Sequence, residues 1–322
     1  MRVLFARRQF NADVPWSSLA PLLPGWDILC CPVRELADAI TDADVVCPFG
    51  ARINRELIAS GRFGLIQQFG VGLDAVDLDA ATEHGVYACR LPADLTGNAD
   101  SVAELAVANT LVLLRRIDET RADLREGRWG GQPMGRSLAG ARVLIVGLGA
   151  IGTAVAARLH PFKARITAVR AHPERGKPDA VSEVFGPDRL KSLVGEADVI
   201  ISCAMLDATT RHLFDAEVIG SMAPGALFVN VARGGLVDET ALLAALNSGR
   251  IAGAGLDVFA REPTAPDDPL ATHPNVIATP HVGGLTGHMF TTSSRLFAEN
   301  LLRWEAGEPP RWTANSPAAL RR

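Results

Sequence analysis

The chain has few cysteines, no long apolar run and no block of like charge. Its five cysteines, an odd number, match no zinc or redox spacing, which favours a reduced, cytoplasmic protein over a disulfide framework. The formal net charge of −4 gives no field that would attract nucleic acid or an anionic membrane. The most apolar stretch, residues 105–114, is too short to span a bilayer, and the first ten residues do not resemble a signal peptide. No cluster has metal-ligand spacing, so we expect neither a metal nor a nucleic-acid or membrane partner.

The length of 322 residues predicts two domains, because it exceeds what one hydrophobic core usually serves. In the first part of the chain, short apolar strands alternate with helical stretches, which is typical of a small α/β unit. The expected strands are residues 3–5, 26–29, 45–47, 65–69 and 86–88, and the expected helices are residues 54–60 and 76–83.

A second α/β pattern is stronger. Six short, almost wholly apolar strands, most of them separated by helical stretches, predict a parallel, doubly wound sheet. These strands are residues 143–146, 166–169, 199–202, 227–231, 252–256 and 276–278. Two long helices, residues 100–116 and 288–304, flank this unit as connections between domains, and residues 307–322 are expected to form an irregular arm.

The first of these strands leads into a glycine pattern, Gly147, Gly149 and Gly152, with the spacing GxGxxG. The first glycine allows a tight turn, the second lets the backbone approach a pyrophosphate, and the third lets helix and strand pack closely. The alternative is a glycine-rich turn without a ligand. The strand before it and the helix after it favour a dinucleotide site, because the helix N-terminus presents free N–H groups to phosphates.

The residue at the end of the next strand indicates the cofactor. An Asp or Glu here would bind the ribose 2′-hydroxyl of NAD, but this chain has Arg170, near His172 and Arg175. A guanidinium suits a 2′-phosphate, so the sequence favours NADP, with NAD bound despite the missing acid as the alternative.

Three ionisable residues follow the last three strands. Arg233, Glu262 and His281 should meet at one edge, because the carboxyl ends of parallel strands lie together. Reduction of a 2-keto acid needs a cation for the carboxylate, a proton donor for the alkoxide and a group that orients this donor. Arg233 is the expected cation, His281 the expected proton donor and Glu262 the group that orients His281. Each residue alone has a structural alternative, such as a helix cap or a surface charge.

Several sequence runs resemble the D-isomer-specific 2-hydroxyacid dehydrogenase family. They cover nearly the whole chain and occur in the family's order, which is more specific than the glycine pattern alone. They are FGVGLDAVD at residues 69–77, GNADSVAE at 97–104, GRW at 127–129, LAG at 138–140, RGGLVD at 233–238, LDVF at 256–259 with Glu262 and Pro263, and Pro280 with His281.

The resemblance implies a Rossmann domain, residues 98–285, inserted into a smaller flavodoxin-like substrate domain, residues 1–97 and 286–322. It also implies a homodimer, and substrate carboxylate binding by the backbone N–H groups of Val71 and Gly72. Asp257 either contacts the nicotinamide carboxamide or only supports its loop. The implied cofactor contacts are Ala150, Ile151, Cys203, Val231, Asp257, His281 and Gly284.

The resemblance predicts an NAD(P)-dependent oxidoreductase that interconverts a small 2-keto acid, such as glyoxylate or hydroxypyruvate, and its D-2-hydroxy acid. Glu262 stands where the formate dehydrogenase branch has Gln, and the glycine loop lacks the lysine of the phosphite-oxidising branch, so neither branch is expected. We also expect no regulatory domain after Arg322, which argues against a long-form phosphoglycerate dehydrogenase. Ala204 departs from the family's usual Pro. The alternative function is a nucleotide-sensing binding protein that resembles the corepressors of this fold.

Overall fold

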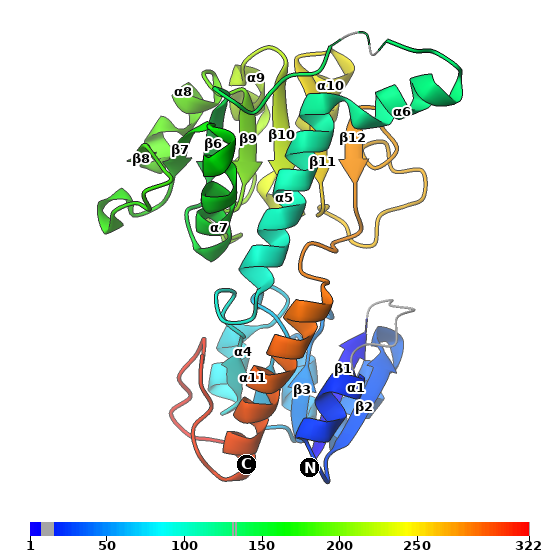
Figure 1. The fold of residues 1–322 in the computed structure, drawn as a ribbon. Coiled ribbons are helices and arrows are strands. Elements are labelled where there is room, and N and C mark those ends of the chain that lie inside the picture. The colour runs from blue at the N-terminus through cyan, green and yellow to red at the C-terminus, as the bar shows by residue number, and fades with distance from the viewer. Residues whose placement is uncertain (8–15, 131, 133, 322) are drawn as a thin grey trace. The chain divides into compact units, whose positions relative to one another are not determined.

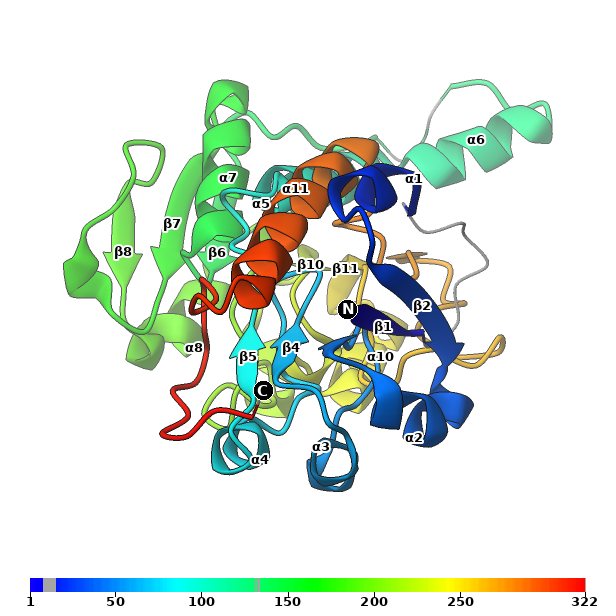
Figure 2. The same ribbon diagram turned by 90° about the horizontal axis from the view of Figure 1, so that it is seen from below.

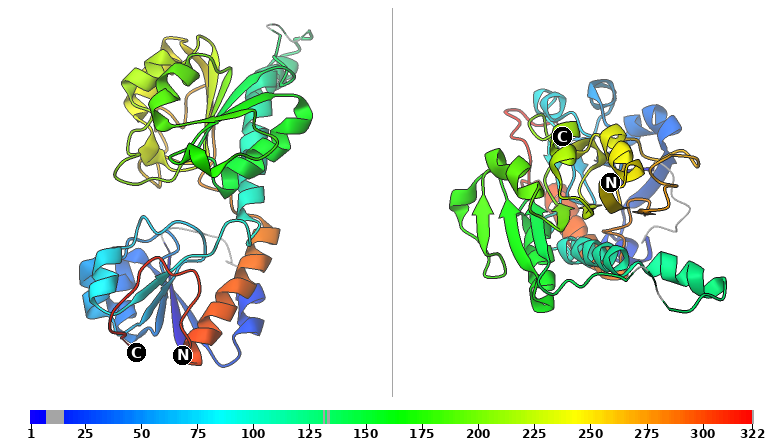
Figure 3. Two further views of the ribbon diagram at one scale, coloured as in Figure 1. Left: turned by 90° about the vertical axis from the view of Figure 1, so that its left-hand side faces the viewer. Right: turned by 90° about the horizontal axis from the view of Figure 1, so that it is seen from above.

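The computed structural model describes residues 1–7, 16–130, 132 and 134–321. These residues divide into two compact units, Met1–Asn98 with Leu285–Arg322, and Ala99–Gly284. Each unit is a parallel sheet with helices on both faces (Figures 1 and 3), which confirms the predicted α/β fold class. Within the described residues no helix has both the length and the apolar character needed to cross a membrane.

The first unit contains a five-stranded sheet in the order β2-β1-β3-β4-β5, which is flavodoxin-like. One face packs on α2, α3 and α4, and the other packs on α1 and α11, as Figure 2 shows. The strands are β1 (Arg2–Arg7), β2 (Asp27–Pro32), β3 (Val45–Cys47), β4 (Leu65–Gln67) and β5 (Tyr87–Cys89), and the helices are α1 (Trp16–Leu19), α2 (Leu36–Ala39), α3 (Arg55–Ser60), α4 (Leu78–Glu83) and α11 (Gly287–Glu305).

The second unit contains a seven-stranded sheet in the order β12-β11-β10-β9-β6-β7-β8. The order reverses between β6 and β9, which is where a doubly wound sheet binds its ligand. The strands are β6 (Arg142–Val146), β7 (Arg165–Val169), β8 (Glu183–Phe185), β9 (Val199–Ser202), β10 (Ala226–Asn230), β11 (Ile251–Leu256) and β12 (Val276–Ala278), and the helices are α5 (Asn98–Arg115), α6 (Ile117–Arg125), α7 (Ala150–Leu159), α8 (Leu190–Val194), α9 (Ala216–Ser221) and α10 (Glu239–Asn247).

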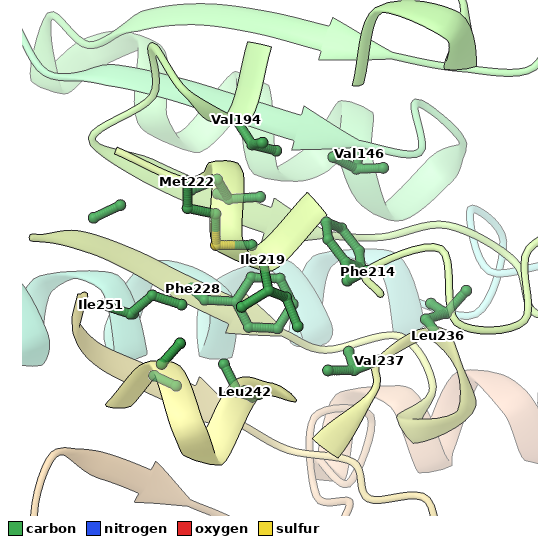
Figure 4. Close-up of a cluster of buried hydrophobic side chains, with 14 of the residues drawn as sticks. Val146, Val194, Phe214, Ile219, Met222, Phe228, Leu236, Val237, Leu242 and Ile251 are labelled. Carbon is green, nitrogen blue, oxygen red and sulfur yellow. The ribbon is translucent and has the colours of Figure 1, made fainter. Parts of the chain in front are cut away.

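Alternating side chains of this sheet form two separate cores. Leu144, Ile200 and Phe228 face α8, α9 and α10, whereas Ile145 and Ile201 face α5 and α7. In the first core, shown in Figure 4, the rings of Phe214 and Phe228 meet edge to face with centroids 4.9 Å apart. Burial on both faces explains why the strand sequences are almost wholly apolar.

Two structural expectations are wrong. The sheet has a seventh strand, β8, which extends it beyond β7. Helix α4 begins at Leu78 rather than at Val76, because Val76 pairs with Ile53 in an isolated bridge and the Asp77 side chain accepts the Ala80 N–H as the cap.

The C-terminal arm is irregular, as expected, but it is bound closely to the first unit. The Arg321 guanidinium donates to the carbonyl oxygens of Ile58 and Gly61, each at 2.7 Å. Thr313 forms a bridge to Cys89 at the edge of β5, and the Asn315 side chain accepts from Ala88 N at 2.8 Å. The arm therefore covers the edge of this sheet.

Candidate active site

The glycine pattern joins β6 to α7 as the sequence predicts. Gly147 has φ +98°, and a Cβ on it would lie 2.4 Å from Ala204 N. A Cβ on Gly152 would lie 2.1 Å from the carbonyl oxygen of Gly147. A Cβ on Gly149 would meet no heavy atom within 4 Å, and no side chain caps the helix there. The exposed backbone at Gly149 and Ala150 therefore has room for a pyrophosphate at the N-terminus of α7.

The other expected cofactor residues lie at the carboxyl ends of neighbouring strands. Cys203 follows β9, and its backbone N donates to the carbonyl oxygen of Val146 at 2.7 Å. Burial raises the pKa of the Cys203 thiol to about 12, so this side chain is neutral. Val231 follows β10 and is buried, while Ile151 lies in the first turn of α7.

Arg170 follows β7 and is half-buried. Its Nη1 donates to the carbonyl oxygen of Gly176 at 3.4 Å, a long contact that positions the guanidinium weakly. His172 Nδ1 instead lies 3.2 Å from the Glu174 carboxylate, so this ring is directed at Glu174. Arg170 therefore occupies the position at the end of β7 where an NAD-binding acid is expected.

Arg233 stands in a turn that the side chain of Asn230 shapes. Asn230 Oδ1 accepts the Ala232 N–H at 3.1 Å, and Nδ2 donates to the carbonyl oxygen of Arg233 at 3.0 Å. Gly234 follows, where a Cβ would lie 1.9 Å from the carbonyl carbon of Phe259. The turn that bears Arg233 is thus packed directly on the backbone of the loop after β11.

That loop carries Glu262, which meets His281. Glu262 Oε2 lies 2.8 Å from His281 Nδ1, and Oε1 accepts the Phe259 N–H at 3.0 Å. The side chain of His281 is 45% exposed, so a substrate can reach its other ring nitrogen. The structure therefore brings together the orienting acid and the histidine that the sequence predicts.

The charges around Glu262 hold it ionised. Burial, the largest single influence, raises the pKa of this carboxyl group. Four influences lower the pKa: the hydrogen bond to His281, the charge of His281, the Phe259 N–H and the charge of Arg233. Together they outweigh burial, so the pKa of Glu262 lies below its ordinary value. Arg233 is thus close enough for its charge to lower the pKa of Glu262, as His281 does.

His281 has a strained backbone with φ +56°, which is uncommon for a residue other than glycine. Its N–H donates to the carbonyl oxygen of Asp257 at 2.8 Å. The buried Asp257 carboxylate accepts from Thr279 Oγ1 at 2.6 Å and from the N–H groups of Val282 and Gly283, each at 2.8 Å. Asp257 thus supports the loop from Thr279 to Gly284, and its contact with nicotinamide stays a prediction.

Val71 and Gly72 belong to the first unit and lie in the loop after β4. The side chain of Gln68 shapes this loop, because its Nε2 donates to the carbonyl oxygen of Gly72 at 2.8 Å and its Oε1 accepts the Phe69 N–H at 3.1 Å. Their role in binding a carboxylate stays a prediction.

Sequence reasoning missed the residues that shape these loops. Asn230, Gln68 and Thr279 each hydrogen-bond a turn, yet none of them carries the charge or ring that marks a catalytic candidate. The only available signal was their place, within two residues of a strand's carboxyl end, where polar side chains in an apolar run need partners.

Residues 107–283 match the sequence model of a protein family, described as D-isomer specific 2-hydroxyacid dehydrogenase, NAD binding domain. The chain belongs to the D-isomer specific 2-hydroxyacid dehydrogenase family. It is 34% identical to a glyoxylate reductase of Thermococcus litoralis over 90% of this chain and 87% of that one. It is 36% identical to a D-3-phosphoglycerate dehydrogenase of Methanocaldococcus jannaschii over 88% of this chain, and here it spans only 54% of the relative.

A crystal structure of an NADPH-dependent glyoxylate/hydroxypyruvate reductase from Sinorhizobium meliloti, in complex with NADP and malonate, shares the fold with a TM-score of 0.81. It is 29% identical, and the match covers 100% of this chain and 98% of that one. Family membership confirms the predicted class, an NAD(P)-dependent oxidoreductase of 2-hydroxy and 2-keto acids, and does not favour the nucleotide-sensing binding protein. It leaves the choice between NAD and NADP open.

Proposed function

We propose that this family member reduces small 2-keto acids, with glyoxylate and hydroxypyruvate as the first candidates, and that Arg233, Glu262 and His281 carry the reaction. The observation that supports this most directly is the 2.8 Å contact between His281 Nδ1 and Glu262 Oε2, in the electrostatic field of Arg233. The relatives named as glyoxylate reductases support the substrate class.

Each of the three residues has a separate task. The Arg233 guanidinium binds the substrate carboxylate through paired N–H donors and polarises the keto oxygen. Because Nδ1 of His281 contacts Glu262, Nε2 is the nitrogen that gives a proton to the developing alkoxide and takes it back in the reverse direction. The backbone N–H groups of Val71 and Gly72 supply further carboxylate contacts.

The residues that fit a dinucleotide are those of the β6–α7 turn and the neighbouring strand ends. Gly149, Ala150 and Ile151 would hold the pyrophosphate, and Cys203, Val231, Asp257 and Gly284 would line the nicotinamide. A bound nicotinamide cofactor supplies the hydride. The room beside Gly149, where a Cβ meets no protein atom, supports this assignment.

The test is a panel of 2-keto acids assayed with NADPH and NADH in parallel. Replacing His281 by Ala should lower turnover roughly a hundredfold or more while cofactor binding persists, because the proton donor is lost. The exposed His160, at the other end of α7, provides the matched control: His160→Ala should retain turnover. Near-wild-type turnover in His281→Ala would overturn the assignment.

Arg170 supports a preference for NADP. A charge-assisted contact with the 2′-phosphate is worth about 1.5–3 kcal/mol, or roughly ten- to a hundredfold in affinity. We expect kcat/KM to favour NADPH, and Arg170→Asp to reverse the preference mainly through the cofactor KM. Equal NADPH-to-NADH ratios in the two proteins would show that Arg170 does not set the choice.

We further propose a homodimer that acts in the cytoplasm. Trp129, Leu124 and Met134, near and beyond the end of α6, are 92%, 60% and 78% exposed, and a second copy of the chain would cover them. Trp129→Ser should lower the mass measured by light scattering to that of a monomer, whereas Phe162→Ser, an exposed aromatic elsewhere, should not. An unchanged dimer would rule out this surface, and cell fractionation tests the location.

A further inference from the structure

The carboxylate of Glu239 is turned away from the helix that it begins. Glu239 is the first residue of α10, and its neighbour Asp238 already caps this helix by accepting the Ala241 N–H at 3.0 Å. Glu239 Oε1 instead accepts the N–H of Ala260 at 2.7 Å. Ala260 lies in the loop after β11, so this bond joins α10 to the segment that carries Glu262.

Two consecutive N–H groups of that loop are each bound by a carboxylate. The Phe259 N–H donates to Glu262 Oε1 at 3.0 Å, and the next N–H, that of Ala260, donates to Glu239. The peptide that joins Phe259 to Ala260 also packs against Gly234, where an added Cβ would lie 2.2 Å from Ala260 N. The Phe259–Ala260 peptide is therefore the point at which the Arg233 turn, the start of α10 and the Glu262 loop meet.

We propose that Glu239 is a positioning residue for the reaction: it fixes the Phe259–Ala260 peptide and, through that peptide, the direction of the Glu262 carboxylate toward His281. This inference rests on the proposed roles of Glu262 and His281. The contact between Glu262 and His281 depends on where Glu262 is anchored, and its second oxygen is anchored to Phe259 N. If the Ala260 N–H is released, the backbone around Phe259 can shift, and Phe259 N, which lies in the adjoining peptide, shifts with it.

The electrostatics agree with this placement. Burial raises the pKa of Glu239, and the charges of Asp268 and Glu262 raise it as well, while the Ala260 N–H lowers it. A carboxylate in this environment loses hydration and lies near other negative charges. Its bond to Ala260 offsets part of that cost, which explains why the side chain remains directed at the loop.

A simpler role must be distinguished, because an acidic residue in the first turn also stabilises a helix through its dipole. Two variants of Glu239 separate the roles. Glu239→Gln keeps an oxygen within reach of Ala260 N but removes the charge, whereas Glu239→Asp keeps the charge but shortens the side chain by one methylene. Positioning predicts that Gln retains kcat within about threefold and that Asp lowers it roughly ten- to a hundredfold, since a misplacement of about 1 Å costs up to a hundredfold. A dipole role instead predicts that kcat stays unchanged in both variants, and that the free energy of unfolding falls in Glu239→Gln but not in Glu239→Asp.

The second readout is a double-mutant cycle with Glu262→Gln, measured on purified protein with glyoxylate or hydroxypyruvate and either cofactor. If Glu239 acts through Glu262, adding Glu239→Asp to Glu262→Gln should lower kcat by less than about threefold more. Cofactor affinity should stay within about twofold in every variant. Glu217, a first-turn acid of α9 that pairs with Lys191, provides the control, and Glu217→Asp should leave kcat unchanged.

The outcomes distinguish this inference from the function on which it rests. If Glu262→Gln alone leaves kcat unchanged, then the proposed role of Glu262 is wrong and Glu239 has nothing to position. Suppose instead that Glu262→Gln lowers kcat. If Glu239→Asp then leaves kcat unchanged, or lowers kcat by the same factor with and without Glu262→Gln, only the positioning role is overturned. Circular dichroism and urea unfolding of each variant verify that a lost rate is not a lost fold.

Discussion

Replacing Asp257 by Asn tests what the most heavily bonded carboxylate of the site does. One of its oxygens accepts from Thr279 Oγ1 and Val282 N, and the other accepts from Gly283 N. An amide has only one oxygen. Whichever way the Asn is placed, its NH₂ group faces either the Val282 or the Gly283 N–H, and that buried donor is left without an acceptor.

The expected magnitude follows from this count. A hydrogen bond to a charged group contributes about 1.5–3 kcal/mol, and Asp257 is only 2% exposed, so solvent does not replace the lost acceptor. We expect the free energy of unfolding of the cofactor-free protein to fall by about 2–3 kcal/mol. Turnover should fall roughly tenfold or more, because the loop that carries the strained backbone of His281 loses a hydrogen bond on one side of that residue.

Urea unfolding without cofactor, together with kcat and cofactor KM, measures both effects. Asp238→Asn is the matched control, because Asn caps a helix about as well as Asp, and among the described residues the Asp238 side chain accepts a single N–H, that of Ala241. If Asp257→Asn leaves the unfolding of the free protein unchanged and raises only the cofactor KM, the carboxylate serves the nicotinamide and the loop-support argument is refuted.

Three further predictions concern single side chains. Gly234→Ala should lower turnover by roughly a hundredfold or more, because its Cβ would lie 1.9 Å from Phe259, whereas Gly220→Ala in α9, with open space around it, should keep full activity in the same assay. As the pH is lowered, the kcat/KM for keto-acid reduction should begin to fall only below the ordinary carboxyl pKa range, because the lowered pKa of Glu262 keeps this carboxyl group ionised down to that range. This loss at acid pH should be absent in Glu262→Gln. The same loss in the variant would assign the titration to another group. Phe228→Ala should lower the free energy of unfolding by about 3–5 kcal/mol in urea titration, since the ring is fully buried against Phe214, and a loss below about 1 kcal/mol would contradict the packing argument.

Apolar periodicity was sufficient to predict most of the sheet positions. Strands β3, β9 and β12 coincide with the predicted ranges, because uninterrupted apolar runs between polar turns leave little freedom in where a buried strand begins. Strand β8 was missed because Glu183, Val184 and Phe185 form an edge strand of three residues, none of them fully buried, and such a segment has no clear period.

The three charged candidates were predictable for a different reason. Arg233, Glu262 and His281 each follow a strand closely, and parallel topology brings such positions to one edge. The contacts that hold them were not predictable. Asp257, which bonds residues 22 to 26 positions further along the chain, and Glu239, which bonds a residue 21 positions away, depend on backbone geometry that no local pattern encodes.

The division of the chain has a consequence for its synthesis. The core of the first unit joins the first strand to the last long helix, since Phe5 packs on Phe297 with ring centroids 5.4 Å apart. All of Ala99–Gly284 leaves the ribosome before that helix exists. The second unit can thus complete its folding during translation, while residues of β1 such as Val3 and Phe5 must wait for α11 with apolar surface uncovered. Chaperone dependence and aggregation during expression should therefore arise from the first-made part of the chain, and a circular permutant that brings α11 next to β1 should relieve both.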